Sequence, residues 1–381
     1  MTSRATVIAA CVPLLLCTLS QASEAAEGVS AGYDKGFFIR SDDARYALKI
    51  SARLQVRHEV VVPDAGDTTS AFSLPRARLK LSGNVFDEAL DYKFEADFGK
   101  GQVSLKDFFA DYAFCSAFHV RAGQYKRPFS RQEINSSGKL IFTDPAITSE
   151  AFGAGRDLGI MLHNGYEKSP TFEWAVALMN GTGDKSRLSG TVVVDPVTGE
   201  GAITGGKLSN VPSTFRPQLL LRAGWNHGKL NGYSEGDLEG GALRFGVAGG
   251  VKMTFDTDGG HSGDIAADID FVLKAQGFAL DGAFYLMSMQ DGPDFADQTF
   301  GATGLHAQAS YLIAGHLLPM VRYARVMPDG GDDEDELALG LTAFLHGHDV
   351  KLTVEGSRLG TDTGATTTAD WRVRTQLQLG F

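Results

Sequence analysis

The sequence predicts an all-β chain whose sixteen antiparallel strands close into a transmembrane barrel. Three observations support this fold class. They are an export signal at the N-terminus, strands that alternate in polarity over unusual lengths, and connections that are alternately short and long.

The first 25 residues are typical of a secretory signal peptide. Arg4 precedes an apolar stretch at residues 5–19, and the small residues Ser23 and Ala25 suit a cleavage site. A transmembrane helix needs roughly 20 apolar residues, and this stretch is shorter. We therefore expect residues 1–25 to be removed on export. Residues 26–43 are then a short N-terminal segment, and residues 44–381 form the barrel.

Composition narrows the function classes. Cys11 and Cys17 lie in the predicted signal, so Cys115 is the single cysteine of the mature chain and can form neither an internal disulfide nor a thiolate metal site. The formal net charge of −11 argues against a nucleic-acid partner. We expect no metal and no cofactor.

The strand segments alternate between apolar and polar residues. At residues 46–60 the chain reads YALKISARLQVRHEV, in which every second residue from Tyr46 is apolar or His58. The last segment, DWRVRTQLQLGF at residues 370–381, alternates in the same way. A strand tilted across a bilayer needs about 9–11 residues, and both segments reach that length. The alternation therefore predicts strands with one face toward lipid and one toward a polar interior.

The connections support a closed barrel. Fourteen more strands are expected to begin near residues 76, 91, 103, 118, 157, 171, 217, 243, 264, 278, 304, 318, 336 and 349. Short turns at 84–88, 115–117, 274–277, 313–316 and 346–348 alternate with long connections at 126–156, 180–215, 288–303 and 360–369. Two connections break this rhythm, because 99–101 is short where a loop is due and 227–242 is long where a turn is due.

Three segments together resemble the phosphate-selective porins of the O and P type. They are LPRARLKLSGNVFDEALDYKFEADF at residues 74–98, VSLKDFFADY at 103–112 and HVRAGQYKRPFSRQE at 119–133. The resemblance implies a homotrimer of 16-stranded barrels in the outer membrane of a Gram-negative bacterium, among lipid and lipopolysaccharide. It also implies a third external loop folded into the pore as a constriction. Our strand count places residues 126–156 between strands five and six, where that loop belongs.

The closing strand resembles that of the same family. It ends in WRVRTQLQLGF, and the resemblance implies that the final Phe381 is an assembly signal read by the barrel assembly machinery.

Nine cations are candidates for an anion pathway. They are Lys49, Arg53 and Arg57 on the polar face of the first strand, Arg76, Arg78 and Lys80 on that of the second, and Lys126, Arg127 and Arg131 in the loop. Residues 126–156 carry five cations against Glu133, Asp144 and Glu150, so a basic wall would face a mildly basic loop. Rings of Arg and Lys select anions, and guanidinium groups suit phosphate oxygens. The sequence thus predicts passive diffusion of small anions, including phosphate or polyphosphate.

The rest of the chain leaves two alternatives open. Residues 141–381 carry 30 Asp and Glu against 17 Lys and Arg, and Asp268, Asp270 and Asp281 are expected to face the lumen. These acids favour a general or organic-solute porin without anion selectivity. A soluble exported β-rich binding protein is the second alternative, since period-2 alternation alone does not identify lipid.

Enzyme motifs are weak. Residues 232–236 fit G-x-S-x-G, but no helical periodicity follows, so a connection between strands eight and nine is the better interpretation. His346-Gly347-His348 is expected to be a turn, and residues 256–259 lack the full spacing of a calcium loop. We predict that the protein is not an enzyme.

Overall fold

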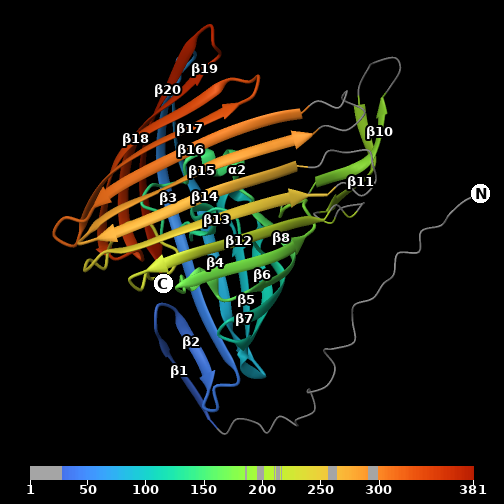
Figure 1. The fold of residues 1–381 in the computed structure, drawn as a ribbon, viewed down its shortest axis with the longest axis vertical. Coiled ribbons are helices and arrows are strands. Elements are labelled where there is room, and N and C mark those ends of the chain that lie inside the picture. The colour runs from blue at the N-terminus through green and yellow to red at the C-terminus, as the bar shows by residue number, and fades with distance from the viewer. Residues whose placement is uncertain are drawn as a thin grey trace, which may run out of the picture.

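The computed structural model describes residues 28–381 apart from 185–186, 195–200, 210, 212–214, 216, 256–263 and 291–298 (Figure 1). The predicted signal peptide and the motif at 256–259 therefore lie outside the described residues. In the part of the chain that the structure describes, no helix is long and apolar enough to cross a membrane.

Sixteen antiparallel strands form a closed barrel, as the sequence predicts. The barrel closes where the last strand pairs with the first, from Trp371 opposite Val62 to Gly380 opposite Arg53. Its strands are β3 (Ala47–Val62), β4 (Thr69–Val85), β5 (Asp87–Asp97), β6 (Ser104–Cys115), β7 (Phe118–Lys126), β8 (Arg156–His163), β9 (Phe172–Met179), β12 (Gln218–His227), β13 (Arg244–Thr254), β14 (Asp264–Ala275), β15 (Phe278–Gln290), β16 (Thr299–Tyr311), β17 (Leu317–Pro328), β18 (Asp333–His346), β19 (Val350–Asp362) and β20 (Thr367–Gly380).

Two hairpins stand apart from the barrel wall. β1 (Val29–Tyr33) and β2 (Phe37–Ser41) lie within the predicted N-terminal segment, and β2 pairs with the start of β3. β10 (Arg187–Val194) and β11 (Gly201–Ser209) form a separate sheet in the connection between β9 and β12. We call the end where β3 begins and β20 ends the terminal end, and the opposite end the loop end.

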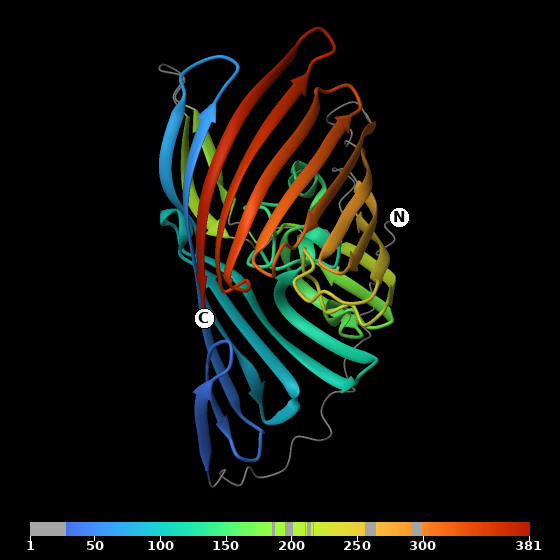
Figure 2. The same ribbon diagram turned by 90° about the vertical axis from the view of Figure 1, so that its left-hand side faces the viewer.

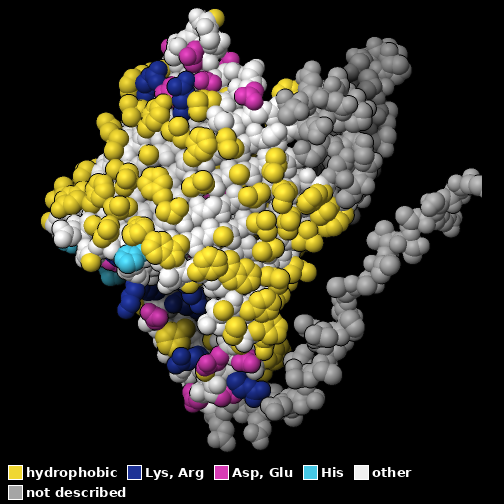
Figure 3. Space-filling model, in the orientation of Figure 1, with side chains coloured by type: hydrophobic (Ala, Val, Ile, Leu, Met, Phe, Trp, Pro, Cys, Tyr) yellow, Lys and Arg dark blue, Asp and Glu magenta, His cyan; other side chains and the backbone are white. Residues whose placement is uncertain are grey.

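The two faces of the strands have opposite polarity. Outward residues such as Ile269, Leu339 and Leu377 remain exposed, and the outer surface is largely apolar (Figure 3). Inward residues of the same sheet, including Gln376 and Gln378, are polar and buried. A soluble protein would bury the apolar set, so this arrangement is that of a barrel with lipid outside and a polar lumen.

The largest difference between a predicted and an observed strand start has a local cause. β4 begins at Thr69, seven residues before the predicted Arg76. Gln55 lies opposite Arg76 but Arg57 lies opposite Ser73, so Leu74 and Pro75 together face one residue of β3. Proline cannot donate to the ladder, and a bulge is one place where a sheet tolerates it.

The connection between β7 and β8 folds into the barrel, as expected of a constriction loop. Residues 127–155 carry two short helices, α1 (Arg131–Ile134) and α2 (Ile147–Phe152), which lie inside the ring of strands (Figures 1 and 2). The side chain of Phe129 is fully buried there, and the Ser130 hydroxyl lies 2.7 Å from the Tyr285 hydroxyl of β15. We call residues 127–155 the constriction loop.

A buried carboxylate of β14 holds the constriction loop against the wall. Asp270 accepts a hydrogen bond from the backbone N–H of Arg131 at 2.9 Å and lies 3.4 Å from its guanidinium. The same carboxylate binds Arg222 of β12 in a bidentate pair of 2.8 and 3.1 Å. The Arg131 guanidinium also lies 4.2 Å from the ring centroid of Tyr233. These four side chains, which we call the Asp270 clamp, join the loop to two strands.

Further along the loop, a second set of contacts reaches the strands around the barrel closure. Thr143 donates to Glu355 of β19 from its backbone N–H at 2.8 Å and from its hydroxyl at 2.7 Å. Asp144 pairs with Arg57 at 2.7 Å, Arg76 at 3.0 Å and Arg374 at 3.1 Å. Both halves of the loop are therefore fixed to the wall.

The long connection at the terminal end also folds inward. Residues 228–243 join β12 to β13, and the Glu235 carboxylate accepts hydrogen bonds from Gln132 at 3.0 Å and from the Ile141 N–H at 2.8 Å. The long connection predicted at 227–242, where a short turn was due, is therefore present in the structure. The extra length lets this segment reach the constriction loop from the other side of the barrel.

Deleting Phe381 should weaken barrel closure. Its backbone N–H donates to the Ala52 carbonyl at 3.0 Å, its carbonyl accepts from the Ala52 N–H at 2.9 Å, and its ring lies 6.1 Å from that of Phe37. We expect a smaller fraction of the deletion variant to migrate as the fast, unheated form on a gel. Phe72→Ala, which removes an exposed phenylalanine near the loop end, is the control. Equal folded fractions for the deletion and the control would contradict the prediction.

Asp270→Asn should loosen the constriction loop. It removes the negative charge shared by two buried arginines, and removing one partner of a comparable buried ion pair lowers stability by about 3–5 kcal/mol. We expect larger and noisier single-channel currents in planar bilayers. Asp333→Asn is the control, because it breaks a partly exposed ion pair with Arg325 near the loop end. Currents that match the wild type in size and noise would show that this carboxylate does not hold the loop.

Candidate pore constriction

A cavity of about 480 Å³ lies between the constriction loop and the wall formed by β4, β7 and β8. We call it the eyelet. Its lining residues are Arg76, Arg78, Lys126, Gln132, Glu133, Asn135, Ser137, Leu140, Pro145, Ser149, Glu150, Gly153, Gly155 and Arg156. The cations come from the strands, and the carboxylates come from the loop.

Several predicted pathway cations are paired with carboxylates. Arg57 and Arg76 share Asp144, and Arg78 pairs with Glu95 at 2.8 Å and Asp97 at 2.7 Å. Burial alone would raise the pKa of Asp144, but the arginines around it hold that pKa well below its usual range. Asp144 is therefore ionised and compensates part of the basic wall.

Of the nine predicted cations, only Arg76, Arg78 and Lys126 line the eyelet, and the two predicted arginines of the loop point elsewhere. Arg127 donates to the Ala154 carbonyl and to Asp157 at 2.6 Å, and Arg131 belongs to the Asp270 clamp. Both side chains are buried, and neither lines the cavity. Each of these two arginines instead attaches the loop to the wall.

Three other predicted cations have no carboxylate within 4.0 Å in the described part of the chain, namely Arg53, Lys80 and Lys126. Arg53 donates to the hydroxyls of Ser136 at 3.2 Å and Ser137 at 2.9 Å. Lys126 donates to the backbone carbonyls of Glu133 and, at 2.7 Å, Asn135. Lys49 lies nearer the terminal end, 3.7 Å from Asp34.

Lys351 contacts the constriction loop but was not among the predicted pathway residues. This β19 residue is 3% exposed and donates to the Leu140 carbonyl of the constriction loop. Lys351, Thr353, Glu355 and Ser357 alternate with apolar or small residues, so the strand pattern could have placed Lys351 on the lumen face. With Arg53 and Lys126, it surrounds loop residues 133–140 from three strands.

The acids expected to oppose anions lie elsewhere in the lumen. Asp268, Asp270 and Asp281 point inward, but they are 4%, 1% and 7% exposed. Asp270 is neutralised in its clamp, and Asp281 accepts a hydrogen bond from Gln308 at 3.2 Å. None of the three lines the eyelet.

A group of possible metal ligands lies in a separate cavity at the terminal end. Asp111, His119 and His163 bring their ligand atoms within 4.8 Å of one another. However, the Gly165 N–H donates to His163 Nδ1 at 3.0 Å, which leaves the proton on Nε2, and that atom lies 3.0 Å from Asp111. Arg121 also donates to Asp111 at 2.8 Å. Arg121 and His163 therefore already engage one oxygen of the Asp111 carboxylate, and His119 Nδ1 lies 3.4 Å from the other oxygen.

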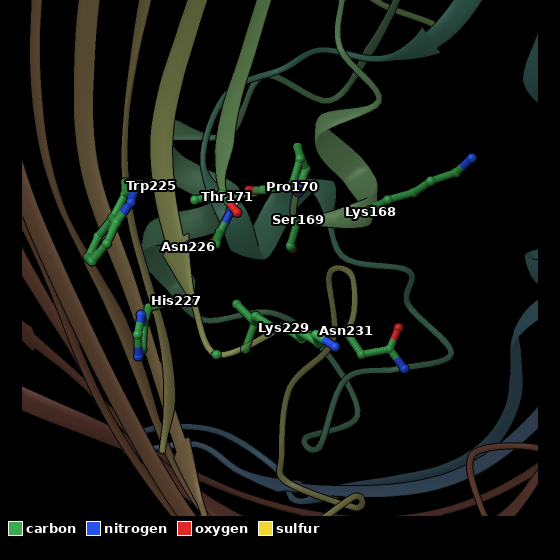
Figure 4. A pocket seen from close by; sticks show the side chains of 11 residues that line it. Lys168, Ser169, Pro170, Thr171, Trp225, Asn226, His227, Lys229 and Asn231 are labelled. Atoms are coloured by element: carbon green, nitrogen blue, oxygen red, sulfur yellow. Dashed lines mark hydrogen bonds between the residues drawn. The ribbon is translucent and has the colours of Figure 1, made fainter. Parts of the chain in front are cut away.

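Another pocket, of about 570 Å³, lies near the start of the inward terminal-end connection (Figure 4). Asn226, one of its lining residues, donates to Glu173 at 2.7 Å and to the Pro170 carbonyl. Trp225 and His227 lie on its strand side, and Lys229 and Asn231 come from the connection. It contains none of the predicted pathway residues.

The enzyme-like motifs lie in connections between strands. Residues 232–236 lie in the connection between β12 and β13, as predicted, and the Ser234 hydroxyl accepts a hydrogen bond from Lys274 at 3.0 Å. No strand-to-helix turn is present there, so a nucleophile elbow is not formed. His346 and His348 flank the turn between β18 and β19.

Comparison with solved structures identifies similar barrels. The anion-selective porin from Comamonas acidovorans matches with a TM-score of 0.61 at 13% identity, covering 88% of this chain and 99% of that one. The outer-membrane channel DcaP of Acinetobacter baumannii matches with a TM-score of 0.58 at 12% identity, covering 88% and 97%. OmpT of Vibrio cholerae matches with a TM-score of 0.55 at 10% identity, covering 87% and 97%. These likenesses show the fold.

The sequence comparisons identify the family. An uncharacterized protein of Aquifex aeolicus (strain VF5) is 23% identical over 348 residues, which cover 80% of each chain. The family model described as phosphate-selective porin O and P matches residues 49–319. The matched region is more than half of the chain and includes β4 to β7, where the resemblance in sequence was noted. The chain therefore belongs to the phosphate-selective porin O and P family.

Proposed function

We propose that this barrel is an outer-membrane channel for the passive diffusion of small anions, which pass between the constriction loop and the basic wall. One observation supports the anion preference most strongly. Arg53, Lys126 and Lys351 surround loop residues 133–140 and donate there to hydroxyl or carbonyl oxygens instead of carboxylates. No carboxylate lies within 4.0 Å of these three basic groups among the described residues, and positive charge in a confined lumen raises the local concentration of anions.

The arginines of the eyelet suit oxyanions. Arg78 is held by Glu95 and Asp97, and Arg156 is held by Asp107 at 2.7 Å. Each carboxylate fixes the direction of a guanidinium group while other N–H donors of that group remain. A fixed planar fork matches phosphate oxygens better than a mobile ammonium does. Together with the family description, this favours phosphate or polyphosphate among the anions.

A general or organic-solute porin is the second candidate. The paired arginines and the loop carboxylates Glu133 and Glu150 favour it, because they reduce the net positive charge that a solute meets. Ion selectivity separates the two candidates.

The proposed setting follows from the family and the fold. Residues 1–25 would direct export, and Phe381 would be read by the barrel assembly machinery. The apolar belt would contact outer-membrane lipid, and the acidic residues 329–335 at the loop end would face lipopolysaccharide. A homotrimer is proposed because porins of this fold include trimers, among them a form of OmpT of Vibrio cholerae.

The double variant Arg53→Gln/Lys126→Gln should lose anion preference. Removing two cations that have no carboxylate partner lowers the potential beside loop residues 133–140. We expect the zero-current potential in a potassium chloride gradient to shift toward that of a cation-preferring channel. Arg325→Gln, which removes an exposed cation near the loop end, is the matched control and should shift it little. A double variant that behaves like the control would refute the proposed pathway.

A further inference from the structure

We propose that the eyelet favours small solutes that carry both a carboxylate and an ammonium group, such as α-amino acids and short peptides. This inference rests on the proposed channel function and names the class of organic solute that the constriction fits. It follows from the way in which charge is divided across the cavity between the strands and the constriction loop.

One side of the eyelet is basic. Arg76, Arg78, Lys126 and Arg156 all project from strands into a space of about 480 Å³. The three arginines are held by wall or loop carboxylates, and Lys126 is held by two loop carbonyls. These donors are therefore fixed in place before a solute arrives.

The opposite side of the eyelet is acidic. Glu133 on α1 and Glu150 on α2 line the cavity, and neither carboxylate has an ion-pair partner within 4.0 Å among the described residues. The third acid of the loop, Asp144, is already shared by three arginines. The two glutamates are thus the loop acids that remain free to meet a solute.

The constriction loop carries three cations and three acids, yet the charged residues that it contributes to the cavity lining are both acidic. Its cations Arg127 and Arg131 turn away to Asp157 and Asp270, which leaves its glutamates facing the basic strands. Opposite charges on facing sides of a narrow space create a field across the path. A solute that bears a carboxylate and an ammonium group lowers its energy by aligning with that field.

Solutes with a single charge are attracted by one side of the eyelet and repelled by the other. A simple carboxylate gains from the arginines but is repelled by the glutamates, and an amine experiences the reverse. A neutral molecule of the same size gains little from either side. Alanine, lactate and lactamide are similar in size and differ in charge, so they separate these cases.

The test compares entry of the three solutes into liposomes that contain the full-length channel. We expect alanine to enter faster than lactamide through the wild type. In the variant Glu133→Gln/Glu150→Gln, alanine entry relative to lactamide should fall by about two- to fivefold, as expected for losing partly exposed ion pairs. Lactate entry should rise in the same variant. Glu88→Gln, at an exposed position near the start of β5 at the terminal end, is the matched control and should leave the entry of alanine and of lactate relative to lactamide unchanged.

Two outcomes would overturn the inference. One is equal entry of alanine and lactamide through the wild type, and the other is an alanine-to-lactamide ratio that the double variant does not change. Zero-current potentials measured on the same preparations keep this test separate from the anion proposal. A cation-preferring channel that still favours alanine would refute the anion proposal and support the field across the eyelet.

Discussion

The pore depends on one buried carboxylate, Asp270, which two arginines share. Arg222 comes from the neighbouring wall, whereas Arg131 comes from the constriction loop. A loop inside a polar lumen has little apolar surface with which to attach, so ion pairs and hydrogen bonds must hold it. Because a buried charge without a partner is costly, each member of the clamp requires the others. The position of α1, and with it that of Glu133, follows from this constraint.

Attachment also decides which charges a solute meets. Arg127 and Arg131 form ion pairs that hold the loop, and Asp144 forms ion pairs with three arginines of the wall. Among the described residues, Arg53, Lys126 and Lys351 around loop residues 133–140 have no carboxylate partner, and the glutamates of α1 and α2 have no basic partner. The paired arginines of the eyelet lie beside them. The net charge of a loop is therefore a poor guide to the charge of a pore. What matters is which side chains remain after the loop has been fixed.

The barrel could be predicted from the sequence because the pattern that identifies each strand lies within that strand. Alternation along a strand reports which face is polar, so all sixteen strands could be placed, and the resemblance to the family implied an inward loop at residues 126–156. Pro75 misplaced the start of β4, since a bulge depends on the partner strand. The clamp could not be predicted, because Arg131 and Asp270 are far apart in the sequence and meet only in the closed barrel. For the same reason, the contacts of Lys351 and Glu235 with the constriction loop could not be predicted, although the strand pattern could have placed Lys351 on the lumen face.

The central claim is that ions pass beside loop residues 133–140, between the constriction loop and the basic wall. Ser137 lines this passage and accepts a hydrogen bond from Arg53. The most direct test introduces Ser137→Cys into a Cys115→Ser background and records current while a negatively charged thiol reagent is added. The account predicts that modification lowers conductance and reduces anion preference more than a neutral reagent of the same size does. Labelling that leaves both conductance and selectivity unchanged would place the path elsewhere and contradict the account.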